Sequence, residues 1–389
     1  MDGLLISADS HVAEPLDLWT SHLPADLRPL GPRIEMRDGV VCMMVEDTVI
    51  RRFKVGGPSV ATGGNPGELG TRTLRDPGEM TEAADREERS GMASMGASDP
   101  DERLADLDSD GVWGEVIYPN LAFFCGYRIE SPTLQVATCR LYNDWLADTF
   151  IGASERFCPV GMLPVLDVDA SVEELSRMAK RGFRAALLPS HIDVRPYNDP
   201  AYEPMWSAAE DLAMPLCFHA GTGRTQTPAH GPGGAVVNYV ITVSGPMETV
   251  TYLCASGVLA RHPGLRVVMV ECGSGWLAWT LHAMDDAYRE HQMFVKPKLD
   301  ELPSEYFRRQ GHVTFQNDPV GFKNIEFTGD RCLMWGSDYP HPEGTFPESR
   351  AYLARQLEGV PDDVARRVVR DNAAELFGFS VPTAPRVSA

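Results

Sequence analysis

The stretch CLMWGSDYPH at residues 332–341 joins an apolar run to side chains that can bind a metal, and a matching arrangement stands at the other end of the chain. Its first four residues read as a buried strand, and Asp338 follows them. Near the N-terminus the run LLI at 4–6 likewise leads into DSH at 9–11. The first and last strands of a closed parallel barrel are neighbours, so residues this far apart in sequence can meet there. The two elements therefore predict two halves of one metal site.

Eight strand-like runs alternate with helical patterns along the chain. Most are continuous runs of Val, Ile, Leu and Met, which is typical of parallel strands covered on both faces. This order predicts an α/β protein, a (β/α)8 TIM barrel. A doubly wound open sheet is the alternative, but the Gly-rich turn that would favour it is not found after the first strand, where SHVA stands at 10–13. The expected strands are residues 4–8, 112–118, 157–163, 183–188, 215–218, 265–270, 312–316 and 332–336.

The length of 389 residues fits one barrel with insertions or two average domains, and we expect a single domain over residues 1–380. Residues 55–100 are rich in Gly, Pro, Met and charge without clear periodicity, which predicts a long insertion after strand one that forms a lid or an arm. The Gly- and Pro-rich segment 222–244 follows the fifth strand and is a candidate pocket wall. Residues 381–389 are expected to form a flexible tail.

Bulk composition excludes several classes of function. The net charge of −20 argues against a nucleic-acid binder, because phosphate neutralisation needs patches of Lys and Arg. No stretch approaches about 20 apolar residues, so no membrane span is expected. The chain opens on MDG without a basic region, and its eight cysteines are scattered without a CxxC pair. We therefore expect a cytoplasmic protein with reduced thiols that acts on a small molecule.

Five polar residues fall at the C-terminal ends of the expected strands: Asp9, His11, His219, Glu271 and Asp338. Barrel enzymes keep their catalytic groups at this rim. An Asp-x-His pattern on a strand points both side chains to one face. Two imidazoles and one or two carboxylates suit one divalent ion, Zn²⁺ or Mn²⁺, with a position left open. Taken singly, each histidine could be a satisfied core residue and each aspartate a turn former, but the shared rim favours a metal site.

Three motifs resemble one known family. They are SADSH at 7–11 followed by Glu14-Pro15, PLCFHAG at 215–221 and WGSDYP at 335–340. Together they are similar to the amidohydrolase superfamily, and more narrowly to the amidohydrolase-related branch of aminocarboxymuconate-semialdehyde and resorcylate decarboxylases. The likeness covers nearly the whole expected barrel.

The resemblance implies a metal bound by Asp9, His11, His219 and Asp338. Many members carry His-x-His on strand one, whereas Asp9 looks more like the Glu-x-His of the resorcylate-type enzymes. An oxygen ligand at that position shifts the expected metal slightly from Zn²⁺ towards Mn²⁺. Related enzymes are commonly dimers or larger, so a homodimer or larger homo-oligomer is expected.

One residue departs from the branch. The decarboxylases typically carry a histidine at the end of strand six, and this chain has Glu271 there. A carboxylate can serve as a general base, particularly where burial raises its pKa, but it cannot act as a cation. Glu271 and Asp338 are therefore the predicted catalytic carboxylates. A structural ion pair with an arginine is the alternative for Glu271.

Three further residues are predicted to contact substrate: His191, His341 and Arg52. His191 lies just past the fourth strand, and His341 lies three residues after Asp338. Arg52 offers two parallel hydrogen bonds to a carboxylate. A surface-loop histidine and a solvated charge are the alternatives for His191 and Arg52.

Three functions compete. The first is a metal-dependent carboxy-lyase, a non-oxidative decarboxylase of a small carboxylated aromatic or enolisable substrate. The second is a metal-dependent hydrolase of an amide, lactone or related C–N or C–O bond, which could serve secondary metabolism. The third is a non-catalytic binding protein on a decayed barrel, which the intact ligand set disfavours.

Overall fold

The computed structural model describes residues 4–37, 40–53, 95–223, 229, 231–341 and 343–382, and the side chains of 51–53, 95 and 235 lie outside that description. Most of the insertion expected at 55–100 therefore lies outside the described residues, as does most of the tail expected at 381–389. The segment expected at 222–244 is described in part, and it contains helix α9.

Parallel strands form the centre of the molecule, in two sheets with the orders β1-β5-β6 and β12-β11-β10-β9-β8-β7. Each of the eight predicted runs overlaps an observed strand, and the run expected at 157–163 contains two, separated only by Val160. The backbone N–H of Val160 donates to Ile117 O at 2.9 Å, so the chain stays hydrogen-bonded to β5 between them. The bounds are β1 Leu5–His11, β5 Val112–Tyr118, β6 Phe157–Pro159, β7 Gly161–Met162, β8 Ala186–Pro189, β9 Leu216–His219, β10 Val267–Val270, β11 Gly311–Phe315 and β12 Leu333–Trp335.

The two ends of this strand order meet. Ser10 and Tyr339 form a parallel bridge. Around it, His11 N donates to Tyr339 O at 2.5 Å and Asp338 N donates to Asp9 O at 2.8 Å. The segment that follows the last strand thus pairs with the end of the first, and the prediction that these two elements meet is confirmed.

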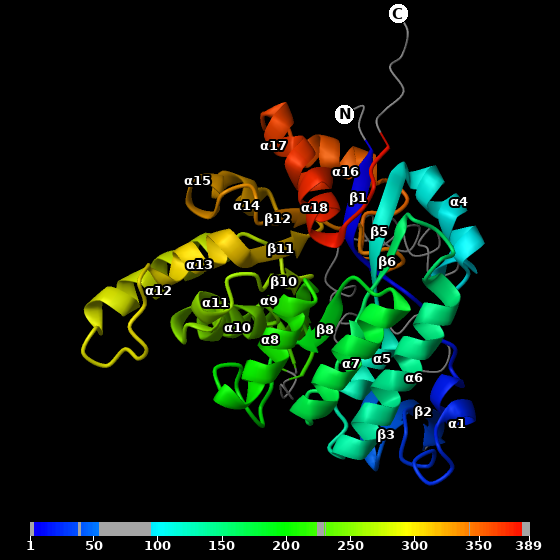
Figure 1. Ribbon diagram of the computed structural model, residues 1–389. Helices are drawn as coiled ribbons and strands as arrows, with labels where there is room; N and C mark the ends of the chain where they lie inside the picture. Colours follow the sequence, from blue (N-terminus) through cyan, green and yellow to red (C-terminus); the bar gives the residue numbers. More distant parts are fainter. Residues whose placement is uncertain are drawn as a thin grey trace, which may run out of the picture.

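The strands are covered on both faces, as their apolar runs predict. Every residue of β1, β8, β9, β10 and β12 is buried, because helices lie around the strands (Figure 1). The α/β class is therefore confirmed. The helices are α1 Leu18–His22, η2 Met95–Ala97, α4 Pro100–Asp110, α5 Leu121–Gly126, α6 Pro132–Phe150, α7 Val168–Arg181, η3 Pro200–Tyr202, α8 Glu203–Asp211, α9 Gly234–Ile241, α10 Ser244–Ala255, α11 Val258–Arg261, α12 Leu277–Glu290, α13 Pro303–Gln310, α14 Pro319–Lys323, α15 Ile325–Thr328, α16 Ser349–Gln356, α17 Asp362–Arg366, η4 Arg367–Asp371 and α18 Asn372–Phe377.

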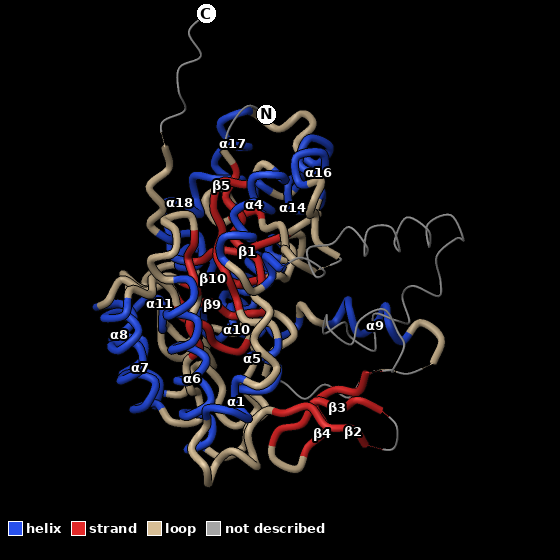
Figure 2. The backbone as a smooth tube through the Cα atoms, turned by 90° about the vertical axis from the view of Figure 1, so that its right-hand side faces the viewer, coloured by secondary structure: helices blue, strands red, loops and turns tan. Residues whose placement is uncertain are grey.

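A small antiparallel sheet follows strand one and was not predicted. It consists of β2 (Arg33–Arg37), β3 (Val40–Val45) and β4 (Thr48–Phe53), in the order β2-β3-β4. Figure 2 shows it standing beside the helix-covered strands. Residues 42–45 of its central strand are buried, and Met43 packs against Cys125 of α5 while Val45 joins the main hydrophobic core.

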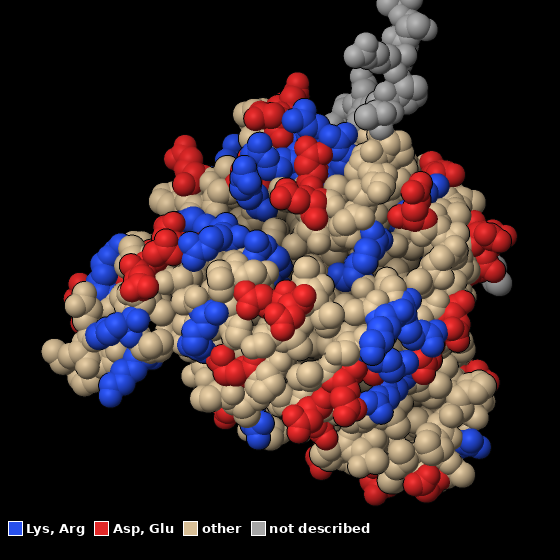
Figure 3. Space-filling view, in the orientation of Figure 1, with Lys and Arg blue, Asp and Glu red and all other residues tan. Residues whose placement is uncertain are grey.

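The surface carries both signs of charge. On the face in Figure 3, Asp and Glu side chains are interspersed with Lys and Arg. Within the described part of the chain, no helix combines the length and the apolar character that crossing a bilayer requires.

Candidate metal centre

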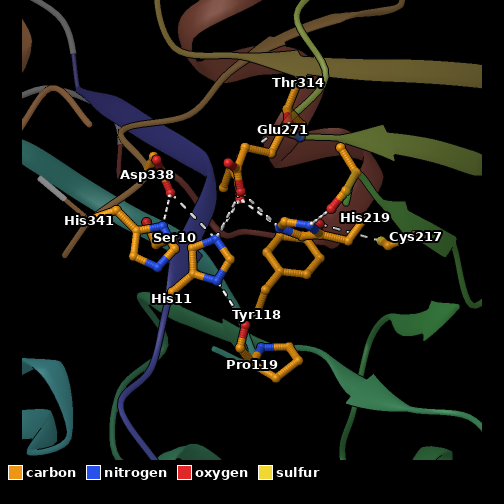
Figure 4. Close-up of polar contacts among 12 residues, drawn as sticks. Ser10, His11, Tyr118, Pro119, Cys217, His219, Glu271, Thr314, Asp338 and His341 are labelled. Carbon is orange, nitrogen blue, oxygen red and sulfur yellow. Dashed lines mark hydrogen bonds and ion pairs between the residues drawn. The ribbon is translucent and has the colours of Figure 1, made fainter. Parts of the chain in front are cut away.

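His11, at the end of β1, turns one ring nitrogen towards a buried centre (Figure 4). Its other nitrogen, Nδ1, lies 2.8 Å from the carbonyl oxygen of Pro119. A carbonyl only accepts, so Nδ1 carries the proton and Nε2 presents a lone pair. Burial, and then the neighbouring His341, lower the pKa of His11 well below its usual value. The ring is therefore neutral at neutral pH.

His219 ends β9 and repeats this arrangement. Its Nδ1 lies 2.9 Å from Ala220 O, which again leaves Nε2 as the lone-pair atom. Burial lowers the pKa of His219 to about 4. The rings of His11 and His219 meet edge to face with centroids 5.0 Å apart. Two neutral imidazoles, one from β1 and one from β9, thus face one centre.

Asp9 approaches the same centre from β1, two residues before His11. Its Oδ1 lies 3.7 Å from His11 Nε2 and 4.0 Å from His219 Nε2. Its Oδ2 accepts from Thr314 Oγ1 and Gln316 Nε2, each at 3.4 Å. Burial, followed by the charges of Glu271 and Asp338, raises the pKa of Asp9 well above its usual value.

Glu271 follows β10 with its backbone in the left-handed region, at a φ of 52°. Its N–H donates to Thr314 Oγ1 at 2.8 Å, which fixes the start of this turn. Its Oε2 lies 3.3 Å from His219 Nε2 and 3.5 Å from His11 Nε2. Left-handed backbone is strained for a residue with a side chain and concentrates at functional sites.

Asp338 follows β12 and is also left-handed, at a φ of 57°. Its Oδ1 lies 3.4 Å from His11 Nε2 and accepts from His341 Nδ1 at 2.8 Å. The His341 ring stacks on the His11 ring with centroids 4.1 Å apart. Burial opposes protonation of His341, but the charge of Asp338 and its hydrogen bond outweigh it and raise the pKa of His341 to about 10. Burial raises the pKa of Asp338.

Four buried atoms at this centre have no hydrogen-bond partner among the described residues: Asp9 Oδ1, His11 Nε2, His219 Nε2 and Asp338 Oδ2. Buried polar atoms are costly without a partner, by about 1–3 kcal/mol each. Imidazole lone pairs that face carboxylate oxygens need a positive charge between them. Ligands about 2.1 Å from one ion lie roughly 3.0–3.6 Å from each other at angles of 90–120°, close to the separations observed here. The residues therefore fit a divalent ion.

The ligand atoms fall into two overlapping groups in which all atoms lie within 4.8 Å of one another. One comprises Asp9, His11, His219 and Glu271, and the other comprises His11, Glu271, Asp338 and His341. Three of the four predicted ligands, Asp9, His11 and His219, thus share a group with Glu271. The fourth, Asp338, belongs to the second group, together with His11 and Glu271. The alternative for Glu271 was an ion pair with an arginine. Among the described residues, its carboxylate instead contacts the imidazoles of His11 and His219.

The three predicted substrate contacts have different surroundings. His341 belongs to the centre, as described above. His191 lies between two carboxylates, with Nδ1 2.8 Å from Glu248 and Nε2 3.1 Å from Asp193, and it belongs to neither ligand group. Arg52 lies in β4 opposite Cys42, but its side chain lies outside the described residues.

Several residues that support the centre were not predicted from the sequence. Thr314 and Gln316 hold Asp9, and the only signal was a threonine inside the apolar run of β11. Glu14 accepts three backbone N–H groups at the start of α5, from residues 120–122 at 2.9 Å each. This cap helps to orient α5, whose Phe123 stacks on the His219 ring with centroids 4.8 Å apart. The ring contact could not be read from spacing.

Comparison with known sequences identifies one family and several related proteins. A sequence profile of the family described as Amidohydrolase matches residues 126–379. A 2-amino-3-carboxymuconate-6-semialdehyde decarboxylase of Dictyostelium discoideum is 23% identical over 293 residues, 72% of this chain and 77% of that protein. A gamma-resorcylate decarboxylase of Rhodococcus jostii is 31% identical over 259 residues, 61% of this chain and 75% of that protein.

Solved structures share the fold. An amidohydrolase of Mycobacterium avium subsp. paratuberculosis matches with a TM-score of 0.77 at 20% identity, covering 97% of this chain and 100% of that one. A dihydroxybenzoic acid decarboxylase of Polaromonas, solved with bound manganese and the inhibitor 2-nitroresorcinol, matches with a TM-score of 0.62 at 17% identity. That alignment covers 98% of both chains.

Proposed function

The chain belongs to the amidohydrolase family, and from this premise we propose that it is a metal-dependent, non-oxidative decarboxylase of a small carboxylated aromatic or enolisable substrate. The observation that carries the proposal is the buried centre, where two neutral imidazoles and the carboxylates present atoms without protein partners. The names of the related enzymes, decarboxylases of gamma-resorcylate and of aminocarboxymuconate semialdehyde, support the reaction class.

We infer that the parallel strands close into a (β/α)8 barrel within a single domain over residues 1–380, with a long insertion after strand one. The continuity of β6 and β7 through Val160 and the bridge from Ser10 to Tyr339 support closure. In such a barrel the centre lies at the C-terminal rim of the strands, where barrel enzymes carry out their chemistry.

We propose Asp9, His11, His219 and Asp338 as ligands of one divalent ion. An oxygen-rich donor set favours Mn²⁺ over Zn²⁺, and the related Polaromonas enzyme was solved with manganese. When bound, the ion would supply positive charge that orients a chelating substrate and stabilises negative charge as the C–C bond breaks.

The side chains of the protein would manage one proton. Decarboxylation releases CO₂, leaves the electron pair on carbon and requires a proton in its place. Glu271 and Asp338 are positioned to hold that proton, since both carboxylates face the centre and Asp338 is hydrogen-bonded to His341. His341 would contact the substrate beside them. His191 and Arg52 are retained as proposals for substrate contacts further out.

The direct test is CO₂ release from a panel of hydroxybenzoates and related carboxylated aromatics. The protein is stripped with a chelator and reloaded with Mn²⁺ or Zn²⁺ before each assay. We expect CO₂ from at least one substrate, and only with a metal present. Metal-replete protein that releases no CO₂ from any member of the panel contradicts the proposal.

Hydrolysis of an amide or lactone is the second candidate, and one observation favours it. Glu271 places a carboxylate, rather than an imidazole, against the centre. A carboxylate base suits activation of water. A panel of lactones and amides in ¹⁸O-labelled water separates the two reactions, because only hydrolysis places ¹⁸O in the product acid.

Two further expectations belong to this proposal. We propose a cytoplasmic enzyme that assembles as a homodimer or larger homo-oligomer. Sedimentation velocity at several protein concentrations tests the assembly, and a single species with the mass of one 42.8 kDa chain contradicts it.

A further inference from the structure

We propose that Glu271 is a direct ligand of the metal ion through Oε2, so that the centre holds its ion with five protein side chains. This inference rests on the metal site proposed above. It differs from a role for Glu271 as a base that stands apart from the ion, because it assigns one oxygen of the carboxylate to the ion itself. The remaining oxygen is then the one available to substrate or to a proton.

The distances at the centre favour Glu271 as a ligand. Glu271 Oε2 lies 3.3 Å from His219 Nε2 and 3.5 Å from His11 Nε2. These separations are shorter than the 3.7 Å and 4.0 Å that separate Asp9 Oδ1 from the same nitrogens. Glu271 Oε2 therefore lies nearer than Asp9 Oδ1 to each of the two nitrogens that an ion at this centre would touch. Figure 4 shows the Glu271 side chain directed towards both rings.

The position of Glu271 in both ligand groups also favours this assignment. Glu271 and His11 are the two residues shared by both ligand groups of the described chain. Glu271 thus lies between the side that holds Asp9 and His219 and the side that holds Asp338. A carboxylate in that position can bind the same ion as the ligands on both sides.

The lone pairs of the two imidazoles also favour a cation beside Glu271. His11 Nε2 and His219 Nε2 carry lone pairs, because the Nδ1 atom of each ring donates a hydrogen bond to a backbone carbonyl. A carboxylate oxygen facing two lone pairs is repelled unless a cation lies between them. His11 Nε2 and His219 Nε2 have no hydrogen-bond partner among the described residues. The cation that satisfies them therefore also lies against Oε2.

The backbone presents Glu271 firmly to the centre. Thr314 Oγ1 accepts the Glu271 N–H at 2.8 Å and donates to Asp9 Oδ2 at 3.4 Å, so one hydroxyl connects the two acidic residues. The loop after Glu271 is held by Asp318, whose Oδ2 accepts from the N–H groups of Ser274 at 2.5 Å and Gly275 at 2.6 Å. Anchored on both sides, the left-handed turn at Glu271 keeps its direction.

Glu271 is also the ligand on the open side. Its side chain is 28% exposed, whereas those of Asp9, His11 and His219 are 0–2% exposed. Among the five proposed ligands, Glu271 therefore has the most exposed side chain. Three carboxylates with two imidazoles form an oxygen-rich set, which favours Mn²⁺ over Zn²⁺.

The test measures metal binding rather than turnover. Chelator-stripped protein is titrated with Mn²⁺ and free ion is followed by electron paramagnetic resonance, for the wild type, Glu271→Gln, Glu271→Asp, Glu343→Gln and His11→Ala. Glu343→Gln is the matched control, because this exposed carboxylate acts on Asp338 and His341 by charge alone. Glu271→Asp keeps the charge and withdraws the oxygen by one methylene. Unfolding curves check that each variant is folded.

Loss of a partner behind a ligand already weakens metal binding by about 10–100-fold, so loss of a ligand should reach about 100-fold. We expect that loss in Glu271→Gln, a clear loss in Glu271→Asp, and less than about tenfold in Glu343→Gln. Cobalt-loaded Glu271→Gln should also show altered visible bands, which report the coordination sphere directly, while Glu343→Gln keeps the wild-type bands.

The inference is overturned if Glu271→Gln binds Mn²⁺ no more weakly than Glu343→Gln and retains the wild-type cobalt spectrum. If Glu271→Gln does not fold, Glu271→Asp decides the question by the same two measurements. His11→Ala separates this outcome from failure of the proposed function. Wild-type binding in His11→Ala contradicts the metal centre itself, whereas loss in His11→Ala with full binding in both Glu271 variants contradicts only the fifth ligand.

Discussion

Two polar clusters with buried side chains involve the neighbouring strands β1 and β5, and they differ in how their charges are satisfied. In the first, Arg103 of α4 pairs with Glu115 of β5, and both side chains are 0% exposed. The guanidinium engages both carboxylate oxygens, with Nη2 3.1 Å from Oε2, and its Nη1 donates to Gly96 O at 3.3 Å. Protein groups therefore neutralise this cluster from within.

In the second cluster the protein does not complete the pairing. Asp9 and His11 of β1 lie next to β5, and Ser7 of the same strand is in register with Glu115. Yet Asp9 Oδ1 and His11 Nε2 have no hydrogen-bond partner within the described residues. Burial alone thus does not distinguish a structural cluster from a functional one. The distinguishing feature is a set of unpartnered atoms that converge on one point.

The largest effect is expected from the loss of one imidazole of the unpartnered cluster. We expect His219→Ala to lower decarboxylation by about 1000-fold or more, because charge stabilisation by a metal contributes several kcal/mol. Without metal, the wild type and this variant should unfold at similar urea concentrations, whereas added Mn²⁺ should stabilise only the wild type. Urea unfolding with and without Mn²⁺ measures both. Equal stabilisation of the two proteins by Mn²⁺ contradicts the assignment.

The satisfied cluster should behave in the opposite way. Glu115→Ala leaves the Arg103 guanidinium buried and unpaired, so we expect the free energy of unfolding to fall by about 3–5 kcal/mol. Metal content per folded molecule should not change. Asp148→Ala is the control, because it removes a 75% exposed partner of Arg181 and should cost less than about 1 kcal/mol. Similar losses in the two variants would remove the contrast between the clusters.

A smaller loss of metal affinity is expected when a residue that supports the ligands is replaced. Thr314→Val keeps the shape of the side chain but removes the hydroxyl that joins Glu271 N to Asp9 Oδ2. We expect Mn²⁺ to bind about tenfold more weakly. Thr280→Val is a matched control, because among the described residues the buried Thr280 hydroxyl is hydrogen-bonded only to Trp276 O, at the residue that precedes its helix. Calorimetric titration of both variants checks the difference, and unchanged affinity in Thr314→Val contradicts a supporting role.

The smallest expected effect is a pH dependence of metal stabilisation. His219, with a pKa of about 4, is neutral throughout the range from pH 5 to 8. Asp9 and Asp338 have pKa values raised by burial, so at the lower pH protons compete with the ion for their oxygens. The rise in melting temperature on adding a fixed concentration of Mn²⁺ should therefore be larger at pH 8 than at pH 5. An equal or larger rise at pH 5 would show that these carboxyls do not bind the ion.

Much of the strand framework could be predicted because buried parallel strands consist of continuous apolar runs. The expected strand at 112–118 has the observed bounds, and the others differ by a few residues. The small sheet β2-β3-β4 was missed, because it belongs to a short antiparallel unit outside the alternating pattern.

The candidate ligands could be found because Asp9, His11, His219 and Asp338 each follow an apolar run. Their mutual arrangement could not be found. The grouping of Glu271 with Asp9 depends on a left-handed turn and on the Thr314 hydroxyl, contributed by a strand some 40 residues away. The bond from His341 to Asp338 depends on the local turn. Side-chain direction in such turns is set by tertiary contacts, which spacing does not reveal.

The most direct measurement is elemental analysis of purified protein after dialysis, for the wild type and His11→Ala. The two proteins differ in one buried imidazole, whose Nε2 faces Asp9, Glu271 and Asp338 at 3.4–3.7 Å. We expect about one divalent ion per wild-type chain and almost none in the variant. A wild-type protein without bound metal after reloading, or a variant that retains as much as the wild type, would contradict the account.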